Sequence, residues 1–382
     1  MQYWSFQRVA AYLGCPPVRC FFGCALLLLA GTRGGRAQAL KPGFDKAEYL
    51  ELLRLHARMG GSDSALWAGI PRPRQFTMAY RSPVVGLDNR WDLWTKAGPQ
   101  PQAVISVRGT TKAQESWLEN LYAAMLPATG ELQLSPTRKF KYHLADNPQA
   151  AVHAGWLLGM AFQAEVIIHK IDSCYRRGTR DVLLMGHSQG GAIAFLLTSH
   201  LRSLQAQGQL PADIRFKTYC SAAPKPGNLY YAYDYERATQ GGWAANVVNP
   251  ADWVPEVPLT VQTTSDFNPA NPFVGVEGII KKQPFAKRLV ARHAYRQLAG
   301  PSRRAQRRYQ RYLGGYVSKA LQKSVPGYQA PAYYPSSNYV RVGPTIVLPA
   351  DATYYTKYPN DPAKLFQHHL FQPYYYLAEK LP

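Results

Sequence analysis

The stretch DVLLMGHSQGGAIAFLL, residues 181–197, places one serine among glycines between two apolar runs. The first run has the length of a buried strand, and the second has the Ala- and Leu-rich composition of a helix. A serine on a sharp strand-to-helix turn adopts strained dihedral angles, so its neighbours must be small, and Gly186, Gly190 and Gly191 leave that room. A glycine-rich turn with an incidental serine is the alternative. The strand, turn and helix together favour Ser188 as a nucleophile.

A serine nucleophile needs a base, and the base needs a carboxylate that orients it. Asp252 follows a predicted buried strand and precedes a Pro-punctuated loop. We therefore expect it to be the acid, with a turn-capping role as the alternative. Three histidines lie beyond it in the sequence: His293, His368 and His369. His293 falls within a basic, helical stretch, so the base is expected at His368 or His369, and the pattern does not choose between these two.

Two further histidines lie near the predicted motifs. His187 precedes Ser188 directly, and we expect its side chain to point away from the turn. His153 lies in the first turn of the long helix predicted over residues 150–178 and is expected to make structural hydrogen bonds rather than to act in catalysis.

The order of predicted elements indicates the α/β class. From residue 150 on, helices and apolar strands alternate, which implies right-handed crossovers and a mainly parallel sheet. Before that, an antiparallel pair leads into the first buried strand. The expected helices are 44–59, 116–126, 150–178 and 190–207, the expected strands are 103–109, 181–186, 214–222, 243–252 and 340–349, and residues 126–149 are expected to be a surface loop.

Residues 260–340 interrupt this alternation. Within them, the stretch 281–323 holds thirteen Lys or Arg residues and no Asp or Glu. No linker divides the chain, so we expect a single domain over residues 40–382 with a basic, mostly helical insertion at about 260–340, before the histidine pair.

The N-terminus has the features of a signal peptide. Basic residues precede a short apolar run, and the small-residue motif AQA ends at Ala39. The expectation is a bacterial Sec-type signal over residues 1–39 and a secreted or periplasmic protein, with an uncleaved signal anchor as the alternative. Cleavage would leave two cysteines, Cys174 and Cys220, whose pairing the sequence does not decide.

The net charge and the metal-ligand motifs of the sequence indicate which partners and cofactors to expect. Among 382 residues, 44 Lys and Arg stand against 23 Asp and Glu, for a formal net charge of +21. The basic stretch 281–323 suits contact with an anionic membrane surface, while a solvated helix that only aids solubility is an equal alternative. No CxxC pair or His/Cys cluster suggests a metal, and no cofactor is expected.

Several blocks resemble the fungal-type, class 3 lipase family of α/β-hydrolases, especially its bacterial exported members. In order, they are VISVRGT with SWLENL, VHAGW, LLMGHSQGGA, KTYCSAAPKPGN, NVVNPADWVPEVP and HHLFQPYYY. They cover most of residues 75–258 and the C-terminus, whereas residues 260–340 have no counterpart. The resemblance implies an α/β-hydrolase fold, with a mainly parallel central sheet flanked by helices.

The resemblance also implies roles for single residues. Ser188 takes the nucleophile's place, Asp252 that of the acid, and His369 or His368 that of the base. His369 is preferred because the family often has an apolar residue and a tyrosine two and five positions on, as in Phe371 and Tyr374. The oxyanion hole would use Thr110 and the backbone N–H of Gln189, which stands in place of the commoner leucine and makes the floor of the site more polar.

The resulting expectation is a secreted serine esterase or lipase that cleaves carboxylic esters of lipids, triacylglycerol or phospholipid, through an acyl-enzyme. One alternative is a feruloyl or other carbohydrate-ester esterase on the same fold. Another is a non-catalytic module that uses the basic insertion to bind polyanions. No nucleic acid partner is expected for the enzyme.

Overall fold

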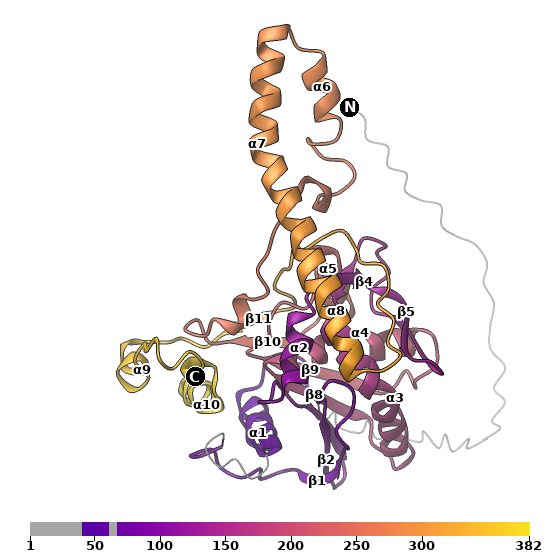
Figure 1. The fold of residues 1–382 in the computed structure, drawn as a ribbon. Coiled ribbons are helices and arrows are strands. Elements are labelled where there is room, and N and C mark those ends of the chain that lie inside the picture. The colour runs from indigo at the N-terminus through magenta and orange to yellow at the C-terminus, as the bar shows by residue number, and fades with distance from the viewer. Residues whose placement is uncertain (1–39, 61–66) are drawn as a thin grey trace, which may run out of the picture. The chain divides into compact units, whose positions relative to one another are not determined.

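A seven-stranded sheet organises the part of the chain that the computed structural model describes, residues 40–60 and 67–382 (Figure 1). The predicted signal peptide, residues 1–39, lies outside these residues. The strand order is β1-β2-β3-β8-β9-β10-β11, with the first two pairs antiparallel and the other four parallel. The strands are β1 (Thr77–Arg81), β2 (Trp91–Lys96), β3 (Gln102–Val107), β8 (Asp181–His187), β9 (Arg215–Ser221), β10 (Ala244–Val248) and β11 (Thr345–Val347).

Helices cover both faces of this sheet. On β8, Val182 and Leu184 belong to the core shared with α3 (Ala154–Arg176) and α4 (Gln189–Ala206). The alternate residues of that strand, Leu183 and Met185, face the core shared with α1 (Lys46–Ala57) and α10 (Phe371–Lys380). This two-residue period is what a strand buried on both faces requires, so the predicted mainly parallel, helix-flanked sheet is confirmed. The other helices include α2 (Gln114–Leu121), α5 (Leu229–Ala238) and α9 (Ala352–Lys357).

Two predictions for residues 116–149 are wrong. The helix α2 ends at Leu121 instead of continuing to residue 126, because Tyr122 leaves helical geometry and the following residues form β4 (Met125–Pro127), paired with β7 (Ala151–His153). The expected surface loop contains the hairpin β5 (Thr129–Ser135) and β6 (Arg138–His143). Its apolar residues alternate along both strands, and Leu132, Leu134 and Tyr142 are buried in the core. The polar residues that alternate with them made the two-residue period of a strand hard to recognise in the sequence.

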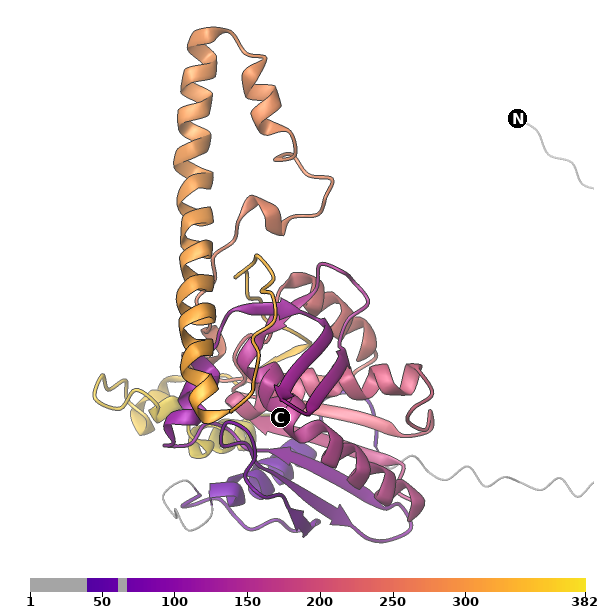
Figure 2. The same ribbon diagram turned by 45° about the vertical axis from the view of Figure 1, so that its right-hand side comes forward.

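The predicted insertion is mostly helical, as expected. It contains η4 (Thr264–Asp266), α6 (Val276–Lys281), the 26-residue helix α7 (Phe285–Gln310), a π-helical stretch η5 (Arg311–Tyr316) and α8 (Val317–Ser324). Figures 1 and 2 show α6 and the first part of α7 side by side, extending away from the sheet, while α8 lies against α2. The basic stretch 281–323 is therefore divided between a projecting part and a part packed on the domain.

All described residues fall in one compact unit, Gln38–Pro382. Cys174 and Cys220 are both buried, and neither forms a disulfide among the described residues. In residues 40–60 and 67–382, no helix has the length and apolar character needed to cross a membrane.

Candidate active site

Ser188 lies on a sharp turn between β8 and α4. Its backbone has φ 61° and ψ −133°, a strained region for a residue with a side chain. The Ser188 amide donates to the carbonyl oxygen of Ser221 at the end of β9, 3.0 Å away, which fixes the turn against the neighbouring strand. The Ser188 hydroxyl does not cap α4, and this side chain is the partly exposed member of an otherwise buried segment.

The glycines around Ser188 are required by close backbone contacts. A Cβ on Gly190 would overlap the carbonyl oxygen of Val107 at the end of β3, and one on Gly186 would overlap the carbonyl of Gly190. A Cβ on Gly191 would lie 2.7 Å from the Ala223 side chain. The three glycines that the sequence places around Ser188 thus allow the first turn of α4 to pack against the ends of β3 and β8.

Asp252 and His369 form a buried pair beside this turn. The Nδ1 atom of His369 lies 2.7 Å from the Oδ2 atom of Asp252. The Tyr374 hydroxyl donates to the same oxygen over 2.8 Å, and the Val254 amide donates to Oδ1 over 3.0 Å. Because these donors hold the carboxylate in place, it in turn fixes the orientation of the imidazole.

The other two candidate histidines lie elsewhere. The ring of His368 is engaged by the Tyr354 hydroxyl at 2.7 Å and by Asn360 Oδ1 at 3.0 Å. His293 is exposed on α7. Of the three, the structure places only His369 on the cavity that contains Ser188. The described contacts include no Ser188–His369 hydrogen bond, a bond that is often loose in a site without substrate.

His187 contributes to the site, contrary to our expectation that its side chain would point away. Its Nε2 atom lies 2.7 Å from the carbonyl oxygen of His369, and its Nδ1 atom lies 3.1 Å from the Ser221 hydroxyl. Tyr49 on α1 completes this chain of contacts at 2.7 Å from the same hydroxyl. Burial, with the nearby His369 and His56, holds the pKa of His187 well below its usual value, so the ring is neutral. The sequence carried no signal for this contact, because its partner is a backbone atom 182 residues away.

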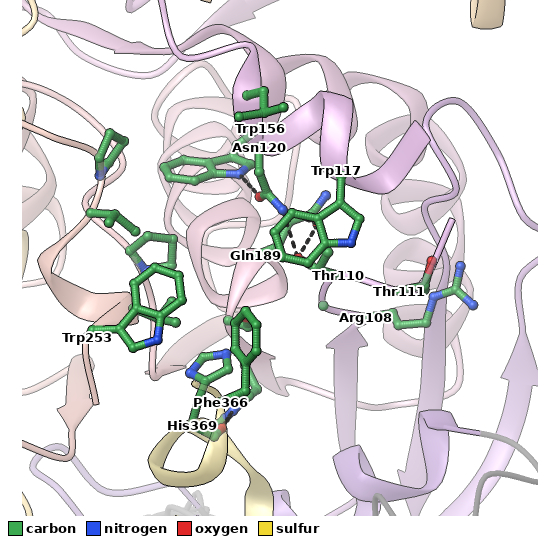
Figure 3. A pocket seen from close by; sticks show the side chains of 18 of the residues that line it. Arg108, Thr110, Thr111, Trp117, Asn120, Trp156, Gln189, Trp253, Phe366 and His369 are labelled. Carbon is green, nitrogen blue, oxygen red and sulfur yellow. Dashed lines mark hydrogen bonds between the residues drawn. The ribbon is translucent and has the colours of Figure 1, made fainter. Parts of the chain in front are cut away.

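Thr110 and Gln189 lie in contact on the side of the cavity opposite His369 (Figure 3). The Thr110 hydroxyl donates to the Gln189 side-chain oxygen over 2.8 Å, and Asn120 donates to Thr110 over 2.9 Å. Trp156 donates to Asn120 over 2.9 Å and completes the network. His153 caps the N-terminus of α3 by accepting from the Trp156 amide, which is the structural role expected of it. Gln189 is the first residue of α4, where backbone N–H groups have no partner within the helix and favour negative charge.

A buried acid, Glu119, lies next to this hydrogen-bond network. Glu119 on α2 is fully buried and accepts from the Asn89 amide over 2.6 Å. Burial raises its pKa to about 8, although the hydrogen bond from Asn89 opposes that shift. Its carboxyl fills a notch on α3, because a Cβ on Gly159 would overlap its Oε1 atom. Nothing in the local sequence SWLENL, residues 116–121, distinguishes Glu119 from a solvated acid.

Ser188, His369, Thr110 and Gln189 all open on one cavity of about 770 Å³. Its rim includes Trp117 and Trp253, whose rings lie 6.2 and 5.3 Å from that of Phe366 (Figure 3). Most of the wall is apolar, with Leu121, Trp156, Val254, Val257, Pro258, Leu259, Leu313, Leu370 and Phe371. No cluster of three or more His, Cys, Asp or Glu residues able to hold a metal occurs within the described ranges.

The sheet order, the strained serine between a parallel strand and a helix, and the acid and histidine that follow it in sequence define an α/β-hydrolase fold. The model of the family Lipase (class 3) matches residues 104–262, from β3 to the loop before the insertion. This match supports the class 3 lipase family. The match ends close to residue 258, where the first resembling region ends, and it does not include the C-terminal block HHLFQPYYY.

Solved structures of fungal lipases are also similar. The Rhizomucor miehei lipase in complex with its propeptide is 19% identical, with 56% of this chain and 62% of that chain covered and a TM-score of 0.40. A fungal lipase–inhibitor complex is 20% identical over 56% and 74%, with a TM-score of 0.42. The lipase of Rhizopus microsporus var. chinensis is 17% identical over 56% and 68%, with a TM-score of 0.39. The matched part thus spans less than two thirds of the Rhizomucor chain. No curated protein matches this chain.

Proposed function

We propose that this protein is a serine hydrolase that cleaves carboxylic esters of lipids. The observation that carries the proposal is that Ser188 and His369 open on one mainly apolar cavity, with His369 paired to the buried Asp252 behind it. A nucleophile, a histidine base and an orienting acid are the parts that acyl transfer requires.

In the proposed mechanism, His369 accepts the Ser188 proton while Oγ attacks the ester carbonyl. Asp252 stabilises the imidazolium through Nδ1. The N–H groups of Thr110 and Gln189 receive the negative charge that develops on the carbonyl oxygen. His369 then gives its proton to the departing alcohol, and the same residues activate water to hydrolyse the acyl-enzyme.

Lipid esters are the proposed substrate class because the cavity is large and lined mainly by apolar side chains. The match of residues 104–262 to the family Lipase (class 3) supports the same substrate class. Hydrolysis rates across p-nitrophenyl esters of increasing chain length would test it, with feruloyl and acetylated-sugar esters as competitors. A maximum on an aromatic or sugar ester would instead select the carbohydrate-ester alternative.

The test of the catalytic assignment is Ser188→Ala. The variant should lose ester hydrolysis by on the order of 10⁴-fold or more and should no longer react with a fluorophosphonate probe. Ser265→Ala, an exposed serine of the insertion, is the matched control and should keep both. Undiminished hydrolysis by folded Ser188→Ala would contradict the assignment.

We further propose that the protein is exported by a bacterial cell through residues 1–39, and that the basic stretch brings it to an anionic membrane surface. The small-residue motif at Ala39 and the charge of residues 281–323 support these two proposals. N-terminal sequencing of the protein from its native compartment would test the first, with Leu40 expected as the new first residue.

A further inference from the structure

The turn that joins α6 to α7, at the projecting end of the insertion, combines apolar and basic side chains. We define the hairpin tip as residues 279–290, which run from the end of α6 through the turn into α7. Its sequence is IIKKQPFAKRLV, with four basic residues and no acidic one. In Figures 1 and 2 this segment lies at the far end of the projecting helices.

The apolar side chains of the hairpin tip are exposed to a degree that is unusual for a cluster. Val290 is 72% exposed, Phe285 69%, Ile279 58% and Leu289 52%. Single exposed apolar residues are ordinary, but several together with a polar border indicate a surface that binds something. Arg288 lies over the Phe285 ring at 5.6 Å, yet all four side chains remain more than half exposed.

The charge of the hairpin tip determines what can bind there. A second copy of this chain would bring the same Lys281, Lys282, Lys287 and Arg288 together, and like charges repel. A nucleic acid would be attracted by the charge and could stack one base on Phe285, but it would leave the aliphatic Ile279, Leu289 and Val290 without a matching partner. An anionic bilayer satisfies both properties, because its headgroups attract lysine and its acyl boundary accepts apolar side chains.

Contacts within the insertion brace the base of the hairpin. Arg303 donates to the Thr264 hydroxyl over 2.9 Å and to the Tyr295 hydroxyl over 3.1 Å, and Ala299 is buried. These contacts join the segment before α6 to the middle of α7. These contacts stabilise the position of the helices that carry the hairpin tip.

The hairpin tip is remote from the cavity. Tyr309 lines the cavity near the other end of α7, and the 24-residue separation from Phe285 corresponds to about 36 Å along the helix. None of the residues 279–290 lines the cavity. The hairpin tip is therefore suited to anchor the protein, not to cover the site.

We propose that the hairpin tip inserts into the headgroup region of bilayers rich in anionic lipid. Phe285, Leu289 and Val290 enter the interface, while the lysines contact lipid phosphates and carboxylates. This deepens the proposed function, since it brings an ester hydrolase to a lipid surface, but binding itself needs no intact triad.

The experiment is co-sedimentation of the full protein with vesicles of phosphatidylcholine alone or with phosphatidylglycerol, at low and high salt. The wild type and Ser188→Ala should bind the anionic vesicles, more weakly at high salt. Reversal of the four charges (K281E, K282E, K287E, R288E) should lower that binding by more than about 10-fold. The triple substitution F285S, L289S and V290S should also lower it, because it removes the inserting side chains.

The matched control reverses four exposed basic residues outside the insertion, K41E, R72E, R74E and K141E, which changes net charge equally. It should retain binding, and all these variants should hydrolyse a soluble short-chain ester as the wild type does. Equal loss in the control, or unchanged binding in both tip variants, would overturn the proposal. So would a tip-dependent affinity for duplex DNA without any for vesicles. If Ser188→Ala retains activity while binding follows the hairpin tip, the catalytic assignment fails and this proposal stands.

Discussion

The Nε2 atom of His187 lies 2.7 Å from the backbone carbonyl oxygen of His369. His187 is the last residue of β8, directly before Ser188, whereas His369 comes from the C-terminal segment that precedes α10. With its ring neutral, Nε2–H donates and Nδ1 accepts from Ser221. This contact joins the strand that carries the serine to the loop that carries the histidine, so it fixes the relative position of the two groups.

Replacement of His187 should therefore impair turnover more than binding. We expect His187→Ala to lower kcat for a soluble ester by roughly 10- to 100-fold, as a misplaced catalytic group does, with little change in KM. His187→Asn retains a side-chain N–H and should recover part of the rate. Steady-state kinetics with circular dichroism as a folding control would measure this. Equal kcat in the wild type and His187→Ala would show that the contact has no positioning role.

Tyr374 bears on the acid in the same way. Tyr374→Phe removes the hydroxyl that donates to Asp252 and accepts from the Asn249 amide. Because a hydrogen bond to a buried charged group is lost, we expect the free energy of unfolding to fall by about 1–3 kcal/mol and kcat to fall with it. Tyr355→Phe, a partly exposed tyrosine of α9, should change neither. A less stable but fully active Tyr374→Phe would limit this residue to a structural role.

Gly190 tests the steric account of the serine turn. A Cβ at this position overlaps the carbonyl oxygen of Val107, so Gly190→Ala must displace α4 or β3. We expect a loss of several kcal/mol in the free energy of unfolding, together with loss of activity. Gly278→Ala in α6, where a Cβ meets nothing within 4 Å, is the control and should be neutral or slightly stabilising. Urea denaturation followed by circular dichroism would compare the two.

The sequence predicted the parallel sheet, the turn at Ser188 and the placement of Asp252, because each depends on local pattern. Apolar runs alternate with helices, and glycines flank the serine at positions where the backbone has no space. The residue pattern alone left His368 and His369 open, since two adjacent histidines have the same sequence neighbourhood, and only the resemblance to the lipase family favoured His369. The choice depends on which ring faces Asp252, which lies 117 residues earlier in the chain.

The contacts of Glu119 and His187 could not be predicted. Glu119 is an acidic residue on a short helix, a position that is usually solvated, and its burial depends on the notch at Gly159 of α3. His187 has a backbone carbonyl as its partner, and every residue carries one. The alternation that identifies β5 and β6 was present in the sequence, but the interspersed Lys and Glu residues favoured a loop.

Glu119 makes a pH dependence measurable. Its pKa is raised to about 8 in the folded protein, against about 4.3 in an unfolded chain. The folded state therefore binds an extra proton between these values, so the free energy of unfolding falls steadily as pH rises from about 4.3 to about 8 and levels off above that. We expect Glu119→Gln to gain stability relative to the wild type from pH 5 to pH 8, by roughly 1 kcal/mol per pH unit. Glu165→Gln, an exposed glutamate, should show no such slope.

His200 should produce a slope of the opposite sign. It lies on α4 against Phe140, is 5% exposed, and its Nδ1 atom is buried with no hydrogen-bond partner among the described residues. Burial lowers its pKa to about 4, so below pH 6.5 the unfolded chain takes up a proton that the folded protein does not. Stability is consequently lost as pH falls from 6.5 toward 4.

His200→Leu removes both this proton uptake and the unpartnered nitrogen. The variant should be at least as stable as the wild type at pH 7.5, and its advantage should grow by about 2 kcal/mol at pH 5. His169→Leu, on the exposed side of α3, keeps the wild-type slope if burial is the cause. Urea denaturation at the two pH values measures the difference. An advantage that stays constant with pH would mean that His200 is protonated in the folded protein, and that α4 is hydrated at this position.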